Sequence, residues 1–356
     1  MRQKFLERLK PLPFPIPSGL AEKENLSPDF VASHAAPECP STLVLTNGHF
    51  AHALSRLSLL KSCVILSLEE AWKQFGPLLH SRAAADLNEE KDPFALLNGA
   101  HHGTGLFFYV PPGVVIKEPV QILSFLSSEG LIAPRIHLFL GAGSSLTLVE
   151  RSVGTGFCVD HIDIQLDENA SLSLTDLMSG VRSLRVSLSR SSRFKSLSYS
   201  KNVRQTMKAV LNEENGDCEL RGLFDLAGTN EAHVSVLVEH RAPHCRSRQH
   251  FKFVNQDKSR SSFEGKIYVH PLAQKTESYQ LNQNLLLSDE ASVVAKPNLE
   301  IFADDVKASH GATISQLNAE DLFYFRTRGF SEAQAKELLR QGFCQELLND
   351  LPIGIS

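Results

Sequence analysis

The chain has 356 residues, of which 42% are hydrophobic and 21% are charged. This composition is typical of a folded globular protein and excludes a disordered one. The formal net charge of −4 provides no basic field for a phosphate backbone, so we expect no nucleic-acid partner. No apolar run approaches the roughly 18 to 20 residues that cross a bilayer, and the first residues lack the pattern of a signal peptide. We therefore expect a cytoplasmic protein with no membrane partner.

The cysteines are far apart in the sequence, and none belongs to a C-x-x-C motif. This spacing favours reduced, mostly buried thiols over a disulfide framework or a structural zinc site. We expect no cofactor and no stably bound metal in the isolated chain. The six cysteines are Cys39, Cys63, Cys158, Cys218, Cys245 and Cys344.

The N-terminal part of the chain has helical spacing of its apolar residues between residues 54 and 97. Pro93, directly after Asp92, suits the first turn of a helix. We predict a mostly helical N-terminal cap over residues 1–104.

The middle of the chain repeats short alternating segments separated by turns rich in Gly, Ser, Asn, Asp and Glu. Ser145 and Ser171 occupy equivalent positions after two such turns and are 26 residues apart. The next turns follow after about 21 and 24 residues, and a period of this size is typical of stacked architectures.

The alternation favours strands, because apolar side chains occur at every second position and would share one face. The clearest sets are Ile136, Leu138 and Leu140; Ile162, Ile164 and Leu166; and Val234, Val236 and Val238. No long amphipathic helix interrupts residues 105–303, which argues against alternating strands and helices. We predict a mainly β protein with a parallel β-helix core over residues 105–315. An antiparallel sandwich or jelly roll is the alternative.

The sequence predicts a helical C-terminal region over residues 316–356. Ser331 followed by Gln334 matches a capping box, and the helix should end by Pro352. Its apolar residues fall on one face and comprise Ala335, Leu338, Leu339, Gly342, Phe343 and Leu347. Such a stripe packs on its own domain at least as often as on a partner.

His310 stands beside Gly311, so backbone on one side of the imidazole is open to another chain or to an ion. A lone histidine is more often a hydrogen-bonded structural residue than a ligand. A second group, His240, His244, Cys245 and His250, has the H-x-x-x-H spacing of some metal sites. Because Pro243 indicates a turn and not a helix, we expect no metal there.

Three segments resemble the SufB/SufD family of iron-sulfur cluster assembly proteins, and the likeness covers roughly residues 42–349. They are GKIYVHPLAQKTESYQLNQNLLLS, LEIFADDVKASHGAT and DLFYFRTRG. SufB members carry His-Glu-Ala where this chain has His310, Gly311 and Ala312, and they have a cysteine on the preceding strand. Here no thiol stands between Cys245 and Cys344. The chain is therefore most similar to the SufD members.

The resemblance implies a right-handed parallel β-helix with helical ends that serves as a noncatalytic scaffold subunit. It implies pairing with SufB, and a transient iron-sulfur cluster in the complex of SufB, SufC and SufD. It places His310 at the SufB interface, assisting iron and cluster assembly, and we expect a carboxylate or carbonyl such as those near Asp304 or Asp305 to orient its ring. An isolated chain could pair with its own copy instead.

The resemblance also implies that the C-terminal helix engages the ATPase SufC, and the residues expected to do so are Leu338, Leu339, Phe343 and Leu347. The alternative function is a β-helix enzyme acting on polysaccharide. Enzymes of that kind are usually secreted and cluster charged residues along a cleft, and neither feature is recognisable in this sequence.

Overall fold

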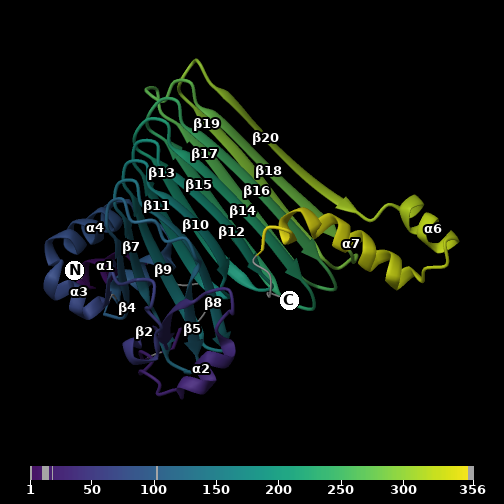
Figure 1. The fold of residues 1–356 in the computed structure, drawn as a ribbon. Helices are drawn as coiled ribbons and strands as arrows, with labels where there is room; N and C mark the ends of the chain where they lie inside the picture. The colour runs from purple at the N-terminus through teal and green to yellow at the C-terminus, as the bar shows by residue number, and fades with distance from the viewer. Residues whose placement is uncertain (1, 10–15, 18, 102, 352–356) are drawn as a thin grey trace.

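The computed structural model describes every residue except 1, 10–15, 18, 102 and 352–356. It is mainly β, with 47% strand and 20% helix, and its strands form a solenoid of about 7 turns with helices toward both ends (Figure 1). The predicted fold class, a parallel β-helix flanked by an N-terminal mixed region and a C-terminal helical region, is confirmed. Parallel pairing between successive coils excludes the antiparallel sandwich.

Two long sheets form the opposite walls of the solenoid. The first runs in the order β2 (His49–Phe50), β1 (Ser41–Thr46), β5 (Val120–Leu126), β8 (Ser145–Gly154), β10 (Ser171–Leu177), β12 (Arg193–Ser200), β14 (Asp217–Leu226), β16 (Arg246–Asn255), β18 (Glu277–Leu286) and β20 (Lys307–Gln316). The second runs from β3 (Val64–Ser67) through β4 (Gly105–Val110), β7 (Arg135–Leu140), β9 (Phe157–Leu166), β11 (Gly180–Leu188), β13 (Val203–Leu211), β15 (Glu231–His240) and β17 (Arg260–Val269) to β19 (Ser292–Ile301), and the short β6 (Leu131–Ile132) pairs with β9.

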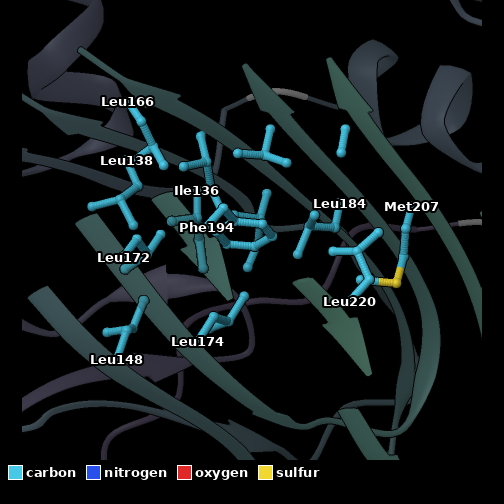
Figure 2. Packing of buried hydrophobic residues seen from close by; sticks show 14 of the residues in the cluster. Ile136, Leu138, Leu148, Leu166, Leu172, Leu174, Leu184, Phe194, Met207 and Leu220 are labelled. Atoms are coloured by element: carbon cyan, nitrogen blue, oxygen red, sulfur yellow. The ribbon is translucent and has the colours of Figure 1, made fainter. Parts of the chain in front are cut away.

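The apolar alternation fills the interior. Ile136 pairs in register with Ile162, and Leu138 with Ile164, so aliphatic side chains stack in columns from coil to coil (Figure 2). Each of these side chains is 4% exposed or less. Complete burial of such a side chain stabilises the fold by about 1.5 to 3 kcal/mol. Ser145 pairs with Ser171, which confirms the equivalence of the two turns.

Toward the last coils the interior wall formed by the first sheet becomes more polar, while β17 keeps Phe263, Ile267 and Val269 inside. Amide and hydroxyl side chains replace aliphatic ones at inward positions of β16 and β18, and each is 3% exposed or less. They are Ser247, Gln249, Ser278, Gln280, Asn282 and Asn284. The two ends of the solenoid therefore have interiors of different chemistry.

The N-terminal region covers the first coils with helices and adds strands. The helices are α1 (Arg2–Arg8), α2 (Pro28–His34), α3 (Leu68–Gln74), α4 (Gly76–Glu89) and α5 (Pro93–Ala100), with a 3-10 turn at His52–Leu54. Asp92 accepts a hydrogen bond from the Phe94 N–H, which starts α5 at Pro93 as predicted. Because β1 pairs with β5, this region also contributes to the first sheet, and the boundary at residue 104 stays a prediction.

The C-terminal region forms two helices, α6 (Ala319–Thr327) and α7 (Glu332–Leu348). The capping box of Ser331 and Gln334 is present, and α7 ends before Pro352, which is outside the described residues. The helix packs on the outer face of the first sheet, where Cys344 and Leu347 join a cluster with Leu197, Leu223 and Val254. No residue of α6 is buried, and this helix extends away from the solenoid (Figure 1).

Candidate functional site: the open end of the solenoid

The last coil leaves the solenoid open. β20 pairs with β18 and β19 pairs with β17, and no strand among the described residues covers their outer edges. Unpaired N–H and C=O groups along such edges are ready to bind a further strand. The open end is therefore an exposed backbone surface of two strands.

His310 lies on β20 in register with Gln280 of β18. Residues in register on parallel strands share a face, so the imidazole is on the interior side of the sheet. Because no further coil covers it, His310 is exposed. The predicted site residue is thus presented at the open end and is not sealed inside.

A depression of about 390 Å³ lies beside this strand. It contains apolar as well as polar groups, since Tyr279 is 40% and Leu281 is 38% exposed. Its lining residues are Arg248, Gln249, His250, Tyr279, Gln280, Leu281, Ser309, His310 and Gly311. Exposed apolar side chains next to an unpaired strand suit a protein partner better than a small polar ligand.

Asp304 and Asp305 do not orient His310, contrary to the expectation. The Asp305 carboxylate forms an ion pair with Lys275. Both aspartates precede Lys307, the first residue of β20, and three residues of extended strand already separate Lys307 from His310 by roughly 10 Å. The prediction failed because closeness in sequence was taken for closeness in space.

The His240 group does not converge on one point. His240 is buried inside the solenoid, where its Nε2 is 2.8 Å from the Ser247 Oγ and burial lowers its pKa to about 4. His250 contacts Gln283 on the outer side of the sheet, and His244 lies in the turn between β15 and β16. Among the described residues, no three His, Cys, Asp or Glu side chains are grouped so as to hold a metal ion.

Five of the six cysteine side chains are buried, and Cys63 is partly buried. Burial raises the pKa of Cys39, Cys245 and Cys344 to about 11, and it raises the pKa of Cys158 and Cys218 further. The thiolate, and not the thiol, is the nucleophile and the metal ligand. No cysteine is among the residues that line the depression beside His310.

The residues predicted to bind SufC occupy two different faces of α7. Leu347 is buried against the solenoid, and Phe343 is half-buried with the Lys252 Nζ 5.1 Å from its ring centroid. Leu339 is also half-buried, whereas Leu338 is 39% exposed. Leu338 is thus the member of the set that points most freely into solvent.

The sequence analysis missed further exposed apolar side chains, on α6 and in the turn before α7. Phe323 is 68%, Tyr324 56% and Phe330 40% exposed. We call these three residues and Leu338 together the aromatic arm. Consecutive aromatics in DLFYF do not follow one helical face, and that irregularity is the signal that could have revealed an unburied helix.

Two family models match almost the whole of this architecture. The SufBD core domain of SUF system iron-sulfur cluster assembly matches residues 124–343, and the SufBD N-terminal region matches residues 37–122. The chain belongs to the SufBD family. The expected membership of the SufB/SufD family, with greatest likeness to SufD, is confirmed. A family of iron-sulfur cluster assembly proteins gives no support to the alternative of a polysaccharide-acting enzyme.

Two of three similar proteins carry the names of this family. An iron-sulfur cluster assembly SufBD family protein of Synechocystis is 29% identical over 345 residues, which cover 88% of this chain and 75% of that protein. The iron-sulfur cluster assembly protein SufD of Escherichia coli is 37% identical over 149 residues, which cover 42% of this chain and 35% of SufD. The chloroplastic protein ABCI7 of Arabidopsis thaliana is 29% identical over 286 residues, or 73% of this chain and 60% of that protein.

None of the helices among the described residues has the length and apolar character needed to span a membrane.

Proposed function

We propose that this SufBD protein is a noncatalytic scaffold subunit of Suf iron-sulfur cluster assembly in the cytoplasm. It pairs with a SufB-type subunit through the open end of the solenoid and engages the ATPase SufC through its C-terminal helices. Iron and sulfide are the substrates of the complex, and the cluster leaves as its product. The observation that carries this proposal is the exposed His310 on an unpaired strand of a SufBD fold.

The open end supports the choice of partner. A strand from a SufB-type subunit can pair with the edge of β20 or β19, and such pairing satisfies the free backbone groups. The neighbouring Tyr279 and Leu281 add apolar area that pairing can bury. An isolated chain can use the same edges to bind its own copy, so we expect homodimers in the absence of SufB.

His310 supports a part in assembly because neutral imidazole is a good ligand for iron. One imidazole is too few to hold a cluster, and the buried thiols of this chain add no ligand. The partner therefore supplies the sulfur ligands. His310 either completes the ligand set of a site at the interface or delivers iron to that site.

The aromatic arm supports contact with SufC. Four apolar side chains on α6, α7 and the turn between them are exposed, although burying them would be favourable. Because α6 buries no residue on its own chain, a partner can cover it without disturbing the solenoid. ATP hydrolysis in SufC would then move this region relative to the SufB interface.

The test is cluster formation on the complex of this chain with SufB and SufC. His310→Ala should reduce the yield of cluster at least tenfold while the three subunits still copurify. Thr313→Ala is the matched control, because Thr313 is also exposed on β20 but faces the outer side. Wild-type yield from the His310→Ala complex would overturn the role of His310, and failure to copurify SufB with the wild-type chain would overturn the proposed partner.

A further inference from the structure

Gln249 and Gln280 form a ladder of side-chain amides inside the last coils. The Nε2 of Gln280 donates a hydrogen bond of 2.8 Å to the Oε1 of Gln249. Both side chains are buried, at 2% and 3% exposure. In such ladders each amide donates to one neighbouring strand and accepts from the other.

The acceptor of the last amide is unused. Gln280 Oε1 is buried and has no hydrogen-bond partner among the described residues. Because its Nε2 donates to Gln249 on the preceding strand, its oxygen is left for a donor other than Gln249. A buried acceptor without a donor is unfavourable, so a donor is missing at this end of the pair; at the other end the Gln249 Nε2 is also buried without a partner among the described residues.

The strand register identifies the residue that follows Gln280 in this column. Gln249 pairs with Gln280, and Gln280 pairs with His310, so the three side chains stand in one column on the interior face. Neighbouring strands are roughly 4.8 Å apart, so rotation of the His310 side chain can bring a ring N–H to the amide oxygen, a hydrogen bond that the described conformation does not contain.

The amide is also held from the opposite wall. Gly265 of β17 lies across the interior, and a Cβ at this position would stand 2.0 Å from the Gln280 Nε2. Only glycine leaves this space open. Gln280 is therefore confined between Gln249 and Gly265.

We propose that Gln280 is the positioning residue of His310, its Oε1 accepting one ring N–H once the imidazole turns toward it. A neutral imidazole has one N–H donor and one bare nitrogen, so fixing the donor fixes which nitrogen keeps its lone pair. That nitrogen is then held ready to bind iron, as in metal sites where the second ring nitrogen donates to a carbonyl or carboxylate. The inference rests on the proposed function of His310 and adds the residue that orients it.

The direct test is the tautomer of His310 in the full-length chain, measured by two-bond ¹H–¹⁵N NMR of labelled histidine. The His310→Ala variant identifies the signal. We expect one tautomer to predominate in the wild type and Gln280→Met, of similar length but without the amide oxygen, to change the tautomer ratio several-fold. Gln280→Glu should keep the wild-type tautomer, because a carboxylate also accepts the N–H.

Asn282→Leu is the matched control. Asn282 occupies the next inward position on β18 and is equally buried, but its register partner is Ala312. It should leave the His310 tautomer unchanged. An unchanged tautomer in folded Gln280→Met, or an equal change in Asn282→Leu, would overturn the positioning role.

Cluster yield on the complex separates this inference from the proposed function. We expect Gln280→Met to lower the yield several-fold, and the double variant with His310→Ala to be no worse than His310→Ala alone. If the tautomer changes but both single variants assemble clusters normally, positioning stands and the proposed function fails. If His310→Ala abolishes assembly but Gln280→Met leaves the tautomer as it was, the function stands and positioning fails.

Discussion

Arg182 and Glu150 form an ion pair in the interior of the solenoid, where each side chain is 2% exposed. Asp160 and Asp176 also contact the Arg182 guanidinium, at 3.2 and 3.1 Å. Three carboxylates thus share one cation away from water. Burial raises the pKa of Glu150 to about 8 and that of Asp160 to about 7, because the charged forms are poorly solvated there.

This cluster makes stability depend on pH in a defined direction. The folded-state pKa values exceed the ordinary values of 4.5 and 3.8, so the folded protein binds protons that the unfolded chain releases. The contribution is fully present below about pH 4 and is lost as the pH rises through 7 and 8. We expect Glu150→Gln to be more stable than the wild type at pH 8.5 by roughly 1 to 3 kcal/mol, and the difference to shrink at pH 5.5. Urea unfolding at both pH values measures this difference in stability. A stability gain of Glu150→Gln that grows toward low pH would contradict the raised pKa of Glu150.

Gly265 is required for packing against Gln280. Gly265→Ala places a Cβ 2.0 Å from the Gln280 amide, so the strands or the amide must move, at a cost of about 1 to 3 kcal/mol. Gly342→Ala in α7 is the control, since no atom lies within 4 Å of the new Cβ and alanine favours a helix by about 1 kcal/mol. Thermal or urea unfolding should therefore give opposite signs for the two substitutions. Equal effects would show that the interior at Gly265 is looser than described.

The aromatic arm and the buried face of α7 should respond differently to a new charge. Phe323→Asp alters a side chain that is 68% exposed, so we expect unchanged stability and at least tenfold weaker binding to SufC. Leu347→Asp buries a carboxylate in the cluster beneath α7 and should destabilise the protein by about 2 to 5 kcal/mol. Pull-down with SufC and urea unfolding measure the two effects. Full SufC binding by folded Phe323→Asp would remove the aromatic arm from the interface.

Lys252 anchors α7 to the first sheet. Its Nζ donates to the Phe343 carbonyl at 3.0 Å and to the Glu346 carboxylate at 2.8 Å, and it lies over the Phe343 ring. Because the lysine is 6% exposed, Lys252→Met keeps most of its apolar stem but removes these contacts. We expect amide hydrogen exchange of α7 to accelerate about tenfold while β14 and β16 remain protected. Lys258→Met, which removes an exposed ion pair with Glu290, should leave exchange in α7 unchanged.

The coils could be predicted wherever the interior is aliphatic. Ile162, Ile164 and Leu166 alternate with polar residues, and a one-residue shift would expose all three, so the pattern determines the face. In β18 the sequence SYQLNQN is polar on both faces, and Gln280 could not be distinguished as an inward residue. Its burial is set by its register with Gln249, which is a contact between coils.

The candidate site was only partly predictable, because it too depends on contacts between coils. His310 was identified from its motif, but its place at the open end depends on β20 being the last strand of the first sheet. The orienting residue was sought among neighbours in sequence, whereas the extended backbone carries Asp305 away and the next coil brings Gln280 near. The stripe on α7 had the correct period, but periodicity alone cannot tell which end of the stripe a sheet covers, so Leu338 and Leu347 could not be separated.

The change from aliphatic columns to amides gives the molecule a gradient of rigidity. In a solenoid each coil is stabilised mainly by its own contacts and by those with its neighbours. The coil that bears His310 has one neighbour and packs on a first-sheet wall of amide side chains, so it opens at a smaller free-energy cost than the coils built around Ile136 and Ile162. A subunit that binds at this end can therefore change the conformation of the last coil while the earlier coils keep theirs.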